Sequence, residues 1–83
     1  MKLNKLANNA HVLVMDNHYY LFSYETHIAT YSDDLTITSD WEEQSQTTKK
    51  HLYAFIREYT PFDACSSRDV NNLIKEGYIG LDC

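Results

Sequence analysis

The chain has 83 residues and a net charge of −5, with seven basic residues against 12 acidic ones, which is the wrong sign of charge for a protein that binds a phosphate backbone by releasing counterions. A hydrophobic fraction of 43% is enough for one modest core, so we expect a single small domain spanning residues 1–83 rather than a disordered chain. No signal peptide opens the chain and no apolar run reaches the roughly 20 residues of a membrane helix, so we expect a cytoplasmic protein.

Two β-strands are predicted in the first part of the chain, at residues 10–15 and 18–31. They flank Asp16 and Asn17, a pair that tolerates the positive φ angles of a tight hairpin turn. The second run is long for one strand, so we expect it to bend or bulge near residues 23–26. One phase of its period-2 pattern is the better candidate for the core. That phase comprises Tyr20, Phe22, Tyr24 and Ile28, and it leaves Ser23, Glu25 and His27 facing water.

A third, shorter strand is predicted at "LTIT", with Leu35 and Ile37 facing inward and the two threonines between and after them facing outward. Together the three strands form an antiparallel meander. The next apolar residue, Trp41, is expected to cover the end of the sheet or the start of the following helix.

A helix is predicted at residues 46–59, because apolar residues recur at i, i+3, i+4 and i+7 from Leu52. Ser45 is its expected N-cap. Thr60 is its expected end, since a residue that precedes a proline, here Pro61, avoids the helical region.

A second, shorter helix is predicted within "SSRDVNNLIKEG", where Ser66 and Asp69 form a capping box and Gly77 ends the helix. Tyr78, Ile79 and Leu81 are then expected to fold back onto the core. The predicted fold is α+β: a three-stranded antiparallel β-meander followed by two helices (β-β-β-α-α), with helices covering one face of the sheet.

Cysteine and glycine usage excludes several kinds of site. Cys65 and Cys83 are too few and too far apart for a disulfide framework, so we expect two reduced thiols, with Cys65 partly buried. No metal site and no cofactor are expected, because His27 and Glu25 share one strand face without a third ligand nearby. Both glycines lie near the C-terminus, which excludes a glycine-rich phosphate loop.

Reactive and chargeable side chains concentrate at the start of the first predicted helix, at Thr47, Thr48, Lys49 and His51. One interpretation is a small-anion site, in which the free N–H groups of the first turn, the hydroxyls and the lysine converge on a phosphate or carboxylate. The other is that the hydroxyls and the imidazole fasten the helix to the sheet, which we favour. No residue stands in a recognised catalytic signature, so we assign no catalytic residue and expect no enzyme.

A candidate protein-binding surface combines the acidic residues in the middle of the chain with a tyrosine, a residue type enriched at interfaces. Its predicted members are Tyr19, Glu25, Asp33, Asp34, Asp40, Glu42 and Glu43. Such a surface suits a basic region on a partner protein.

Two segments, "LFSYETHIATY" and "SQTTKKHLYAFI", resemble small uncharacterised proteins of tailed phages and prophages. In those proteins a strand of the form F-S-Y-x-T-x-x-A is followed by S-x-T-T-x-x-H before an amphipathic helix. The matching positions here are Phe22, Ser23, Tyr24, Thr26 and Ala29, then Ser45, Thr47, Thr48 and His51. The resemblance implies a phage context, in which small acidic proteins often bind and block a host or defence protein, including CRISPR effectors.

We therefore expect a non-enzymatic, phage-type binding protein that engages a host or defence protein, for example a nucleic-acid-handling enzyme with a basic groove. The alternative is a small-anion or nucleotide-binding protein that uses the N-terminus of the first helix. A weaker alternative is a DNA-binding helix pair that uses Arg68 and Lys75. Either a monomer or a homodimer formed through an exposed edge strand is compatible with the sequence.

Overall fold

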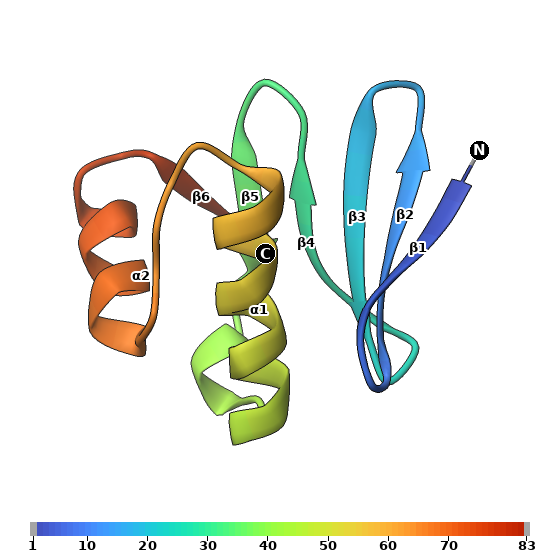
Figure 1. The fold of residues 1–83 in the computed structure, drawn as a ribbon. Coiled ribbons are helices and arrows are strands. Elements are labelled where there is room, and N and C mark those ends of the chain that lie inside the picture. The colour runs from blue at the N-terminus through green and yellow to red at the C-terminus, as the bar shows by residue number, and fades with distance from the viewer. Residues whose placement is uncertain (1, 83) are drawn as a thin grey trace.

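The computed structural model describes residues 2–82, and within them the central element is a six-stranded sheet with its strands in chain order (Figure 1). The strands are β1 (Lys2–Ala7), β2 (Ala10–Met15), β3 (His18–Ser23), β4 (Thr26–Tyr31), β5 (Leu35–Thr38) and β6 (Ile79–Asp82). The first five form an antiparallel meander, and β6 returns to pair parallel with β5. Between β5 and β6 lie the 3-10 helix η1 (Trp41–Glu43) and the helices α1 (Gln46–Tyr59) and α2 (Ser67–Lys75), which cover one side of the sheet.

The α+β class is confirmed, but the prediction of only three strands was wrong. β1 is an edge strand of sequence KLNKLA, and none of its residues is fully buried, so it lacks the hydrophobic alternation of a half-buried strand. β6 has four residues, one of them a glycine, and it pairs with a strand more than 40 residues away. Neither strand carries a local signal strong enough to be recognised from the sequence.

Residues 18–31 form a hairpin of two strands rather than one long strand with a bend. Tyr24 and Glu25 occupy its two-residue turn with φ angles of 51° and 69°. Tight turns of this kind favour glycine, asparagine or aspartate. A tyrosine and a glutamate at these positions give no turn signal, so the turn was not predicted from the sequence. The backbone N–H of Tyr24 donates to the carbonyl of Asn9, 2.8 Å away, which joins this turn to the β1–β2 turn at the lower end of Figure 1.

The hairpin reverses the phase that was predicted to face the core. In β3 the buried residues are Leu21 and Ser23, whereas Tyr20 and Phe22 point to the opposite side of the sheet and Tyr24 is 53% exposed. Ile28 is buried as predicted, but it is the extra residue of a bulge, because Ala29 pairs with Leu21 while His27 pairs with Phe22. The expectation that Ser23 faces water was therefore wrong, and that for His27 and Glu25 is confirmed by their exposure.

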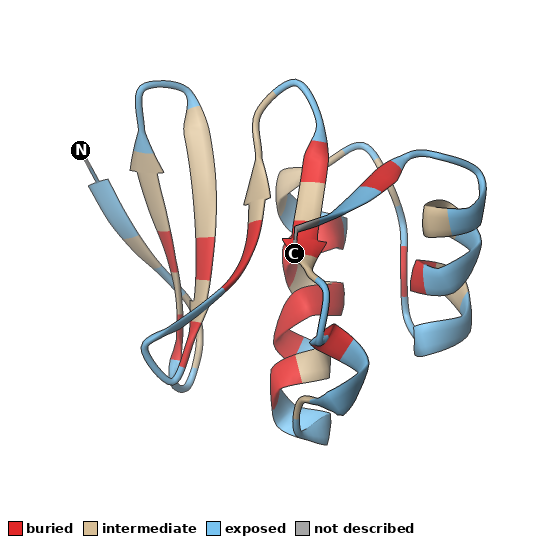
Figure 2. Cartoon of the chain, turned by 180° about the vertical axis from the view of Figure 1, so that it is seen from behind, coloured by how far each residue is buried: buried red, intermediate tan, exposed pale blue. Residues whose placement is uncertain are grey.

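The helix α1 begins and ends where the sequence predicted. Ser45 is its N-cap and accepts a hydrogen bond from the backbone N–H of Thr48, and Thr60 is its C-cap. Leu52, Phe55 and Ile56 of α1 are buried, and Figure 2 shows several buried stretches along this helix. Trp41 is 2% exposed in the same core, which agrees with its predicted covering position.

The end of the chain follows the prediction only in part. Ser66 is the N-cap of α2 but makes no capping bond with its side chain; instead a carboxylate oxygen of Asp69 accepts from the backbone N–H of Cys65. Ile79 is buried, whereas Tyr78 and Leu81 are 54% and 45% exposed and do not fold onto the core.

Gly77 follows α2 with a φ angle of 86°, a conformation that favours glycine at the end of a helix. Cys65 is an exposed free thiol rather than a partly buried one, and Cys83 lies outside the described residues. Within residues 2–82, no helix is long and apolar enough to cross a membrane.

Candidate functional site

The threonine, lysine and histidine cluster of α1 is divided by the structure into buried and exposed members. Thr48 and His51 are 5% and 6% exposed, and both contact Ser23 of β3, which is 1% exposed. The Oγ of Ser23 lies 3.0 Å from Oγ1 of Thr48 and 2.8 Å from Nδ1 of His51. Thr47 is exposed and Lys49 half-buried, and neither hydrogen-bonds to this buried group.

The buried group forms a directed chain of hydrogen bonds. Burial lowers the pKa of His51, and a hydrogen bond to the backbone of Asn8 opposes this by raising it. We assign Nδ1 of the neutral imidazole as the acceptor of the Ser23 hydroxyl proton, which leaves Nε2 to carry the ring hydrogen. Thr48 then donates to Ser23, and Ser45 donates to Thr48 over 3.2 Å.

This chain, which we call the polar clamp (Ser23, Ser45, Thr48 and His51, with the backbone of Asn8), ties three parts of the molecule together. It joins the N-terminus of α1 to β3 and to the β1–β2 turn, and among residues 2–82 no buried side-chain nitrogen or oxygen lacks a partner. A serine hydroxyl on a histidine is also the geometry of an activated nucleophile. Here the hydroxyl is shut inside the protein, so the geometry fits fastening of the helix to the sheet.

The predicted acidic binding surface is not one continuous patch. Asp33 and Asp34 lie before β5, and Asp40, Glu42 and Glu43 lie after it, so the strand separates the two groups along its length. Glu25 lies in the β3–β4 turn. Tyr19 packs on the helix-covered side, with ring centroids 6.4 Å from Tyr31 and 5.5 Å from Tyr59. The hydroxyl of Thr38 lies 2.6 Å from the carboxylate of Asp40 and lowers its pKa.

The opposite side of the sheet is not covered by any helix of residues 2–82, and we call its surface over β1 to β4 the open face (Figures 1 and 2). The strand register places five large apolar side chains there: Leu3, Leu13, Met15, Tyr20 and Phe22. The same register adds three imidazoles, His11, His18 and His27, together with Lys5 at the edge. Across these four strands the open face carries no carboxylate.

Aromatic rings form a continuous row on the open face. The ring of His18 stacks on Tyr20 at 6.0 Å, and His27 lies 5.9 Å from Tyr20 and 5.5 Å from Phe22. None of these residues belongs to the hydrophobic core, and Leu3 is 62% exposed. An apolar and aromatic centre without acidic groups is the composition typical of the core of a protein interface.

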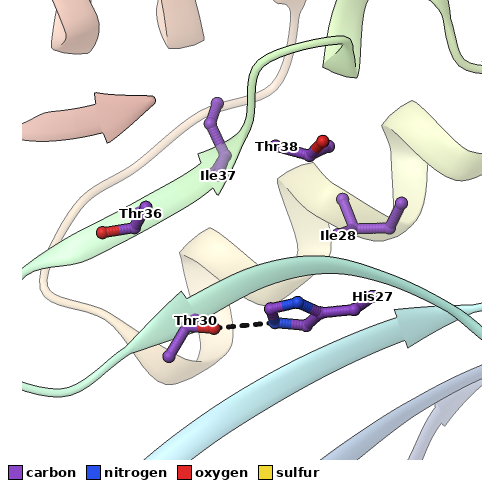
Figure 3. A pocket seen from close by; sticks show the side chains of 6 residues that line it. All are labelled: His27, Ile28, Thr30, Thr36, Ile37 and Thr38. Carbon is purple, nitrogen blue, oxygen red and sulfur yellow. Dashed lines mark hydrogen bonds between the residues drawn. The ribbon is translucent and has the colours of Figure 1, made fainter. Parts of the chain in front are cut away.

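A small hollow of about 70 Å³ adjoins the open face between β4 and β5 (Figure 3). Its lining residues are His27, Ile28, Thr30, Thr36, Ile37 and Thr38. Nε2 of His27 hydrogen-bonds to Oγ1 of Thr30 at 2.7 Å and to the carbonyl of Ala29 at 3.0 Å. The hollow is far below the roughly 300 Å³ of a small-molecule pocket. Within residues 2–82, no three His, Cys, Asp or Glu side chains are grouped as ligands of a metal ion.

Sequence analysis missed the open face because it assigned Tyr20 and Phe22 to the core. The signal that could have found it was the residue between them: with Leu21 in the core, Ser23 also turns inward and both aromatic rings turn outward. Tyr19, chosen as the surface tyrosine, is in the same phase as Leu21.

Comparison with known proteins assigns the chain to a protein family. A family model matches residues 1–72. The chain belongs to a protein family of unknown function, DUF8033. The match to DUF8033 includes β1 to β5, α1 and the first part of α2, and therefore both the polar clamp and the open face. It links the chain to no phage protein. No curated protein and no solved structure matches the chain.

Proposed function

We propose that this protein is a small non-enzymatic binding protein that modulates a partner protein by covering part of its surface, and that the open face is its contact surface. The proposal rests on the row of aromatic, apolar and imidazole side chains on the open face. The helices pack against the other side of the sheet and leave this row uncovered. Monomeric proteins rarely leave a large apolar patch in water without a partner for it.

The distribution of charge supports a particular kind of partner surface. The open face lacks carboxylates, whereas Asp33, Asp34 and Asp40 lie exposed at the two ends of the adjoining strand β5. An apolar centre bordered by acidic groups suits a partner with an apolar spot surrounded by basic residues. A nucleic-acid-handling enzyme has such basic surroundings.

The class of partner is suggested by the sequence alone. The resemblance of residues 21–56 to small phage and prophage proteins favours a host or defence protein, for example a CRISPR effector, met in the cytoplasm of the host cell. The alternative of an anion or nucleotide site at the start of α1 has less support. Thr48 and His51 already hydrogen-bond within the polar clamp, so their polar groups do not converge on a free space.

Affinity capture with a matched pair of variants tests the proposal. Tyr20→Lys places a charge at the centre of the open face, and Tyr78→Lys makes the same change at an exposed tyrosine elsewhere. Each protein is immobilised, and a lysate of the cells in which the protein is naturally made is passed over it at about 0.15 M salt, where long-range charge effects are screened. A partner protein identified by mass spectrometry is expected with the wild type and with Tyr78→Lys, and lost with Tyr20→Lys. Equal capture by all three proteins would refute the assignment of the open face.

A further inference from the structure

We propose that two copies of this chain form a dimer by packing their open faces against each other around a two-fold axis. This inference goes beyond the proposed function, because it concerns the protein when no partner is bound. A bound partner protein then competes with the second copy for the same surface.

Charge argues for a second copy as the occupant. Two chains that each carry a net charge of −5 repel each other wherever their acidic surfaces meet. Packing two open faces together brings no carboxylate of β1 to β4 in one copy against a carboxylate of the same strands in the other. Lys5 lies on the edge strand β1 and Asp40 beyond the end of β5, so both stay at the rim of such an interface, where water solvates them.

The strand register gives the open face a shape that suits face-to-face packing. Leu3, Leu13 and Tyr20 are direct cross-strand neighbours and form one apolar row across β1, β2 and β3. A two-fold axis that passes near Leu13 brings this row against its own copy. Facing sheets pack about 10 Å apart with interdigitated side chains, a distance that leucine and tyrosine side chains from the two faces fill.

The available area suits a weak dimer. The four strands of the open face, at a spacing of about 4.8 Å and each about six residues long at 3.3 Å per residue, give a flat face of roughly 19 by 20 Å, or about 380 Å². The accessible area is larger because side chains stand out from the sheet. Even so, it does not exceed the roughly 600 Å² per copy that the smallest stable interfaces bury, and we expect a weak dimer with a dissociation constant on the order of 100 µM.

Sedimentation equilibrium of the full chain tests the inference over about 10 to 500 µM, a range that brackets the expected dissociation constant. For the wild type near neutral pH, the mass should rise with concentration from 9.7 kDa toward twice that value. Leu3→Lys and Tyr20→Lys should weaken association at least tenfold. Their matched controls, Leu81→Lys and Tyr78→Lys, alter exposed residues outside the open face and should leave it unchanged. Circular dichroism of each variant establishes that it is folded.

Two outcomes would overturn the inference. A wild type that stays monomeric at every concentration would do so while leaving the proposed function standing, since partner capture is measured separately. An association that survives Tyr20→Lys would point to pairing through the edge strand β1, because Tyr20 lies on the inner strand β3.

Discussion

Replacing Ser23 by alanine removes the centre of the polar clamp and leaves its neighbours buried. The Ser23 hydroxyl contacts Nδ1 of His51 at 2.8 Å and Oγ1 of Thr48 at 3.0 Å, and both of these residues are less than 10% exposed. In Ser23→Ala the imidazole nitrogen loses its donor and the threonine hydroxyl loses its acceptor.

The expected cost follows from the two polar atoms left without partners. Each buried unsatisfied group costs about 1–3 kcal/mol, and the easier burial of alanine offsets part of this, so we expect a loss of about 2–3 kcal/mol. For a domain of this size a loss of 1 kcal/mol lowers the melting temperature by about 4–8 °C. Ser23→Ala should therefore melt about 10–20 °C below the wild type. Urea unfolding followed by circular dichroism at about pH 7.5, where an ordinary histidine is neutral, measures the free energy directly.

Two further variants distinguish the stability lost with the hydrogen bonds of the polar clamp from the stability that any substitution nearby would cost. Thr47→Ala removes an exposed hydroxyl one residue away from Thr48 and should change stability by no more than about 0.5 kcal/mol. The double variant Ser23→Ala, His51→Leu removes donor and acceptor together, so it should cost less than the sum of the single changes by at least about 1 kcal/mol. A loss below about 0.5 kcal/mol in Ser23→Ala, or strict additivity in the double variant, would refute the hydrogen-bond chain.

Three other predictions follow from particular contacts. Burial holds the pKa of His51 below its ordinary value of 6.5, so the unfolded chain binds a proton first and stability should fall as pH drops below about 6.5; urea titrations should show this slope reduced in His51→Leu. Glu25→Gly relieves a φ angle of 69° and should raise the free energy of unfolding by about 1 kcal/mol; a lower melting temperature would contradict this. Asp69→Ala should cost about 1 kcal/mol because it frees the N–H of Cys65, whereas Ser66→Ala should cost much less; thermal melts of the pair decide between them.

Helices were predicted well because their signals are local. The apolar stripe from Leu52, the cap at Ser45 and the stop before Pro61 all lie within one segment of chain, and each acts through its immediate neighbours. The strand at residues 35–38 was also predicted with its inward and outward residues, since its period-2 alternation is regular. These elements needed no knowledge of the remaining chain.

The sheet as a whole could not be predicted, because pairing depends on residues far apart in sequence. β1 and β6 are stabilised by β2 and β5 rather than by their own composition, and the turn at Tyr24 and Glu25 is held by a bond to Asn9. The candidate site was likewise predicted only in part. Thr48 and His51 were identified from their position on α1, whereas Ser23 and the open face required the phase of β3.

The polar clamp and the open face are coupled through that phase. A slip of β3 by one residue would carry Tyr20 and Phe22 into the core and turn Ser23 toward water, because alternate residues face opposite sides of a sheet. By hydrophobicity alone the slipped register is competitive, since it buries two aromatic rings. It also leaves Nδ1 of His51 buried without its donor, and a buried polar group of this kind can select one register at a cost in stability. We therefore interpret the clamp as the feature that keeps the aromatic residues on the surface, so that a serine enclosed in the core determines which side chains are free to bind a partner.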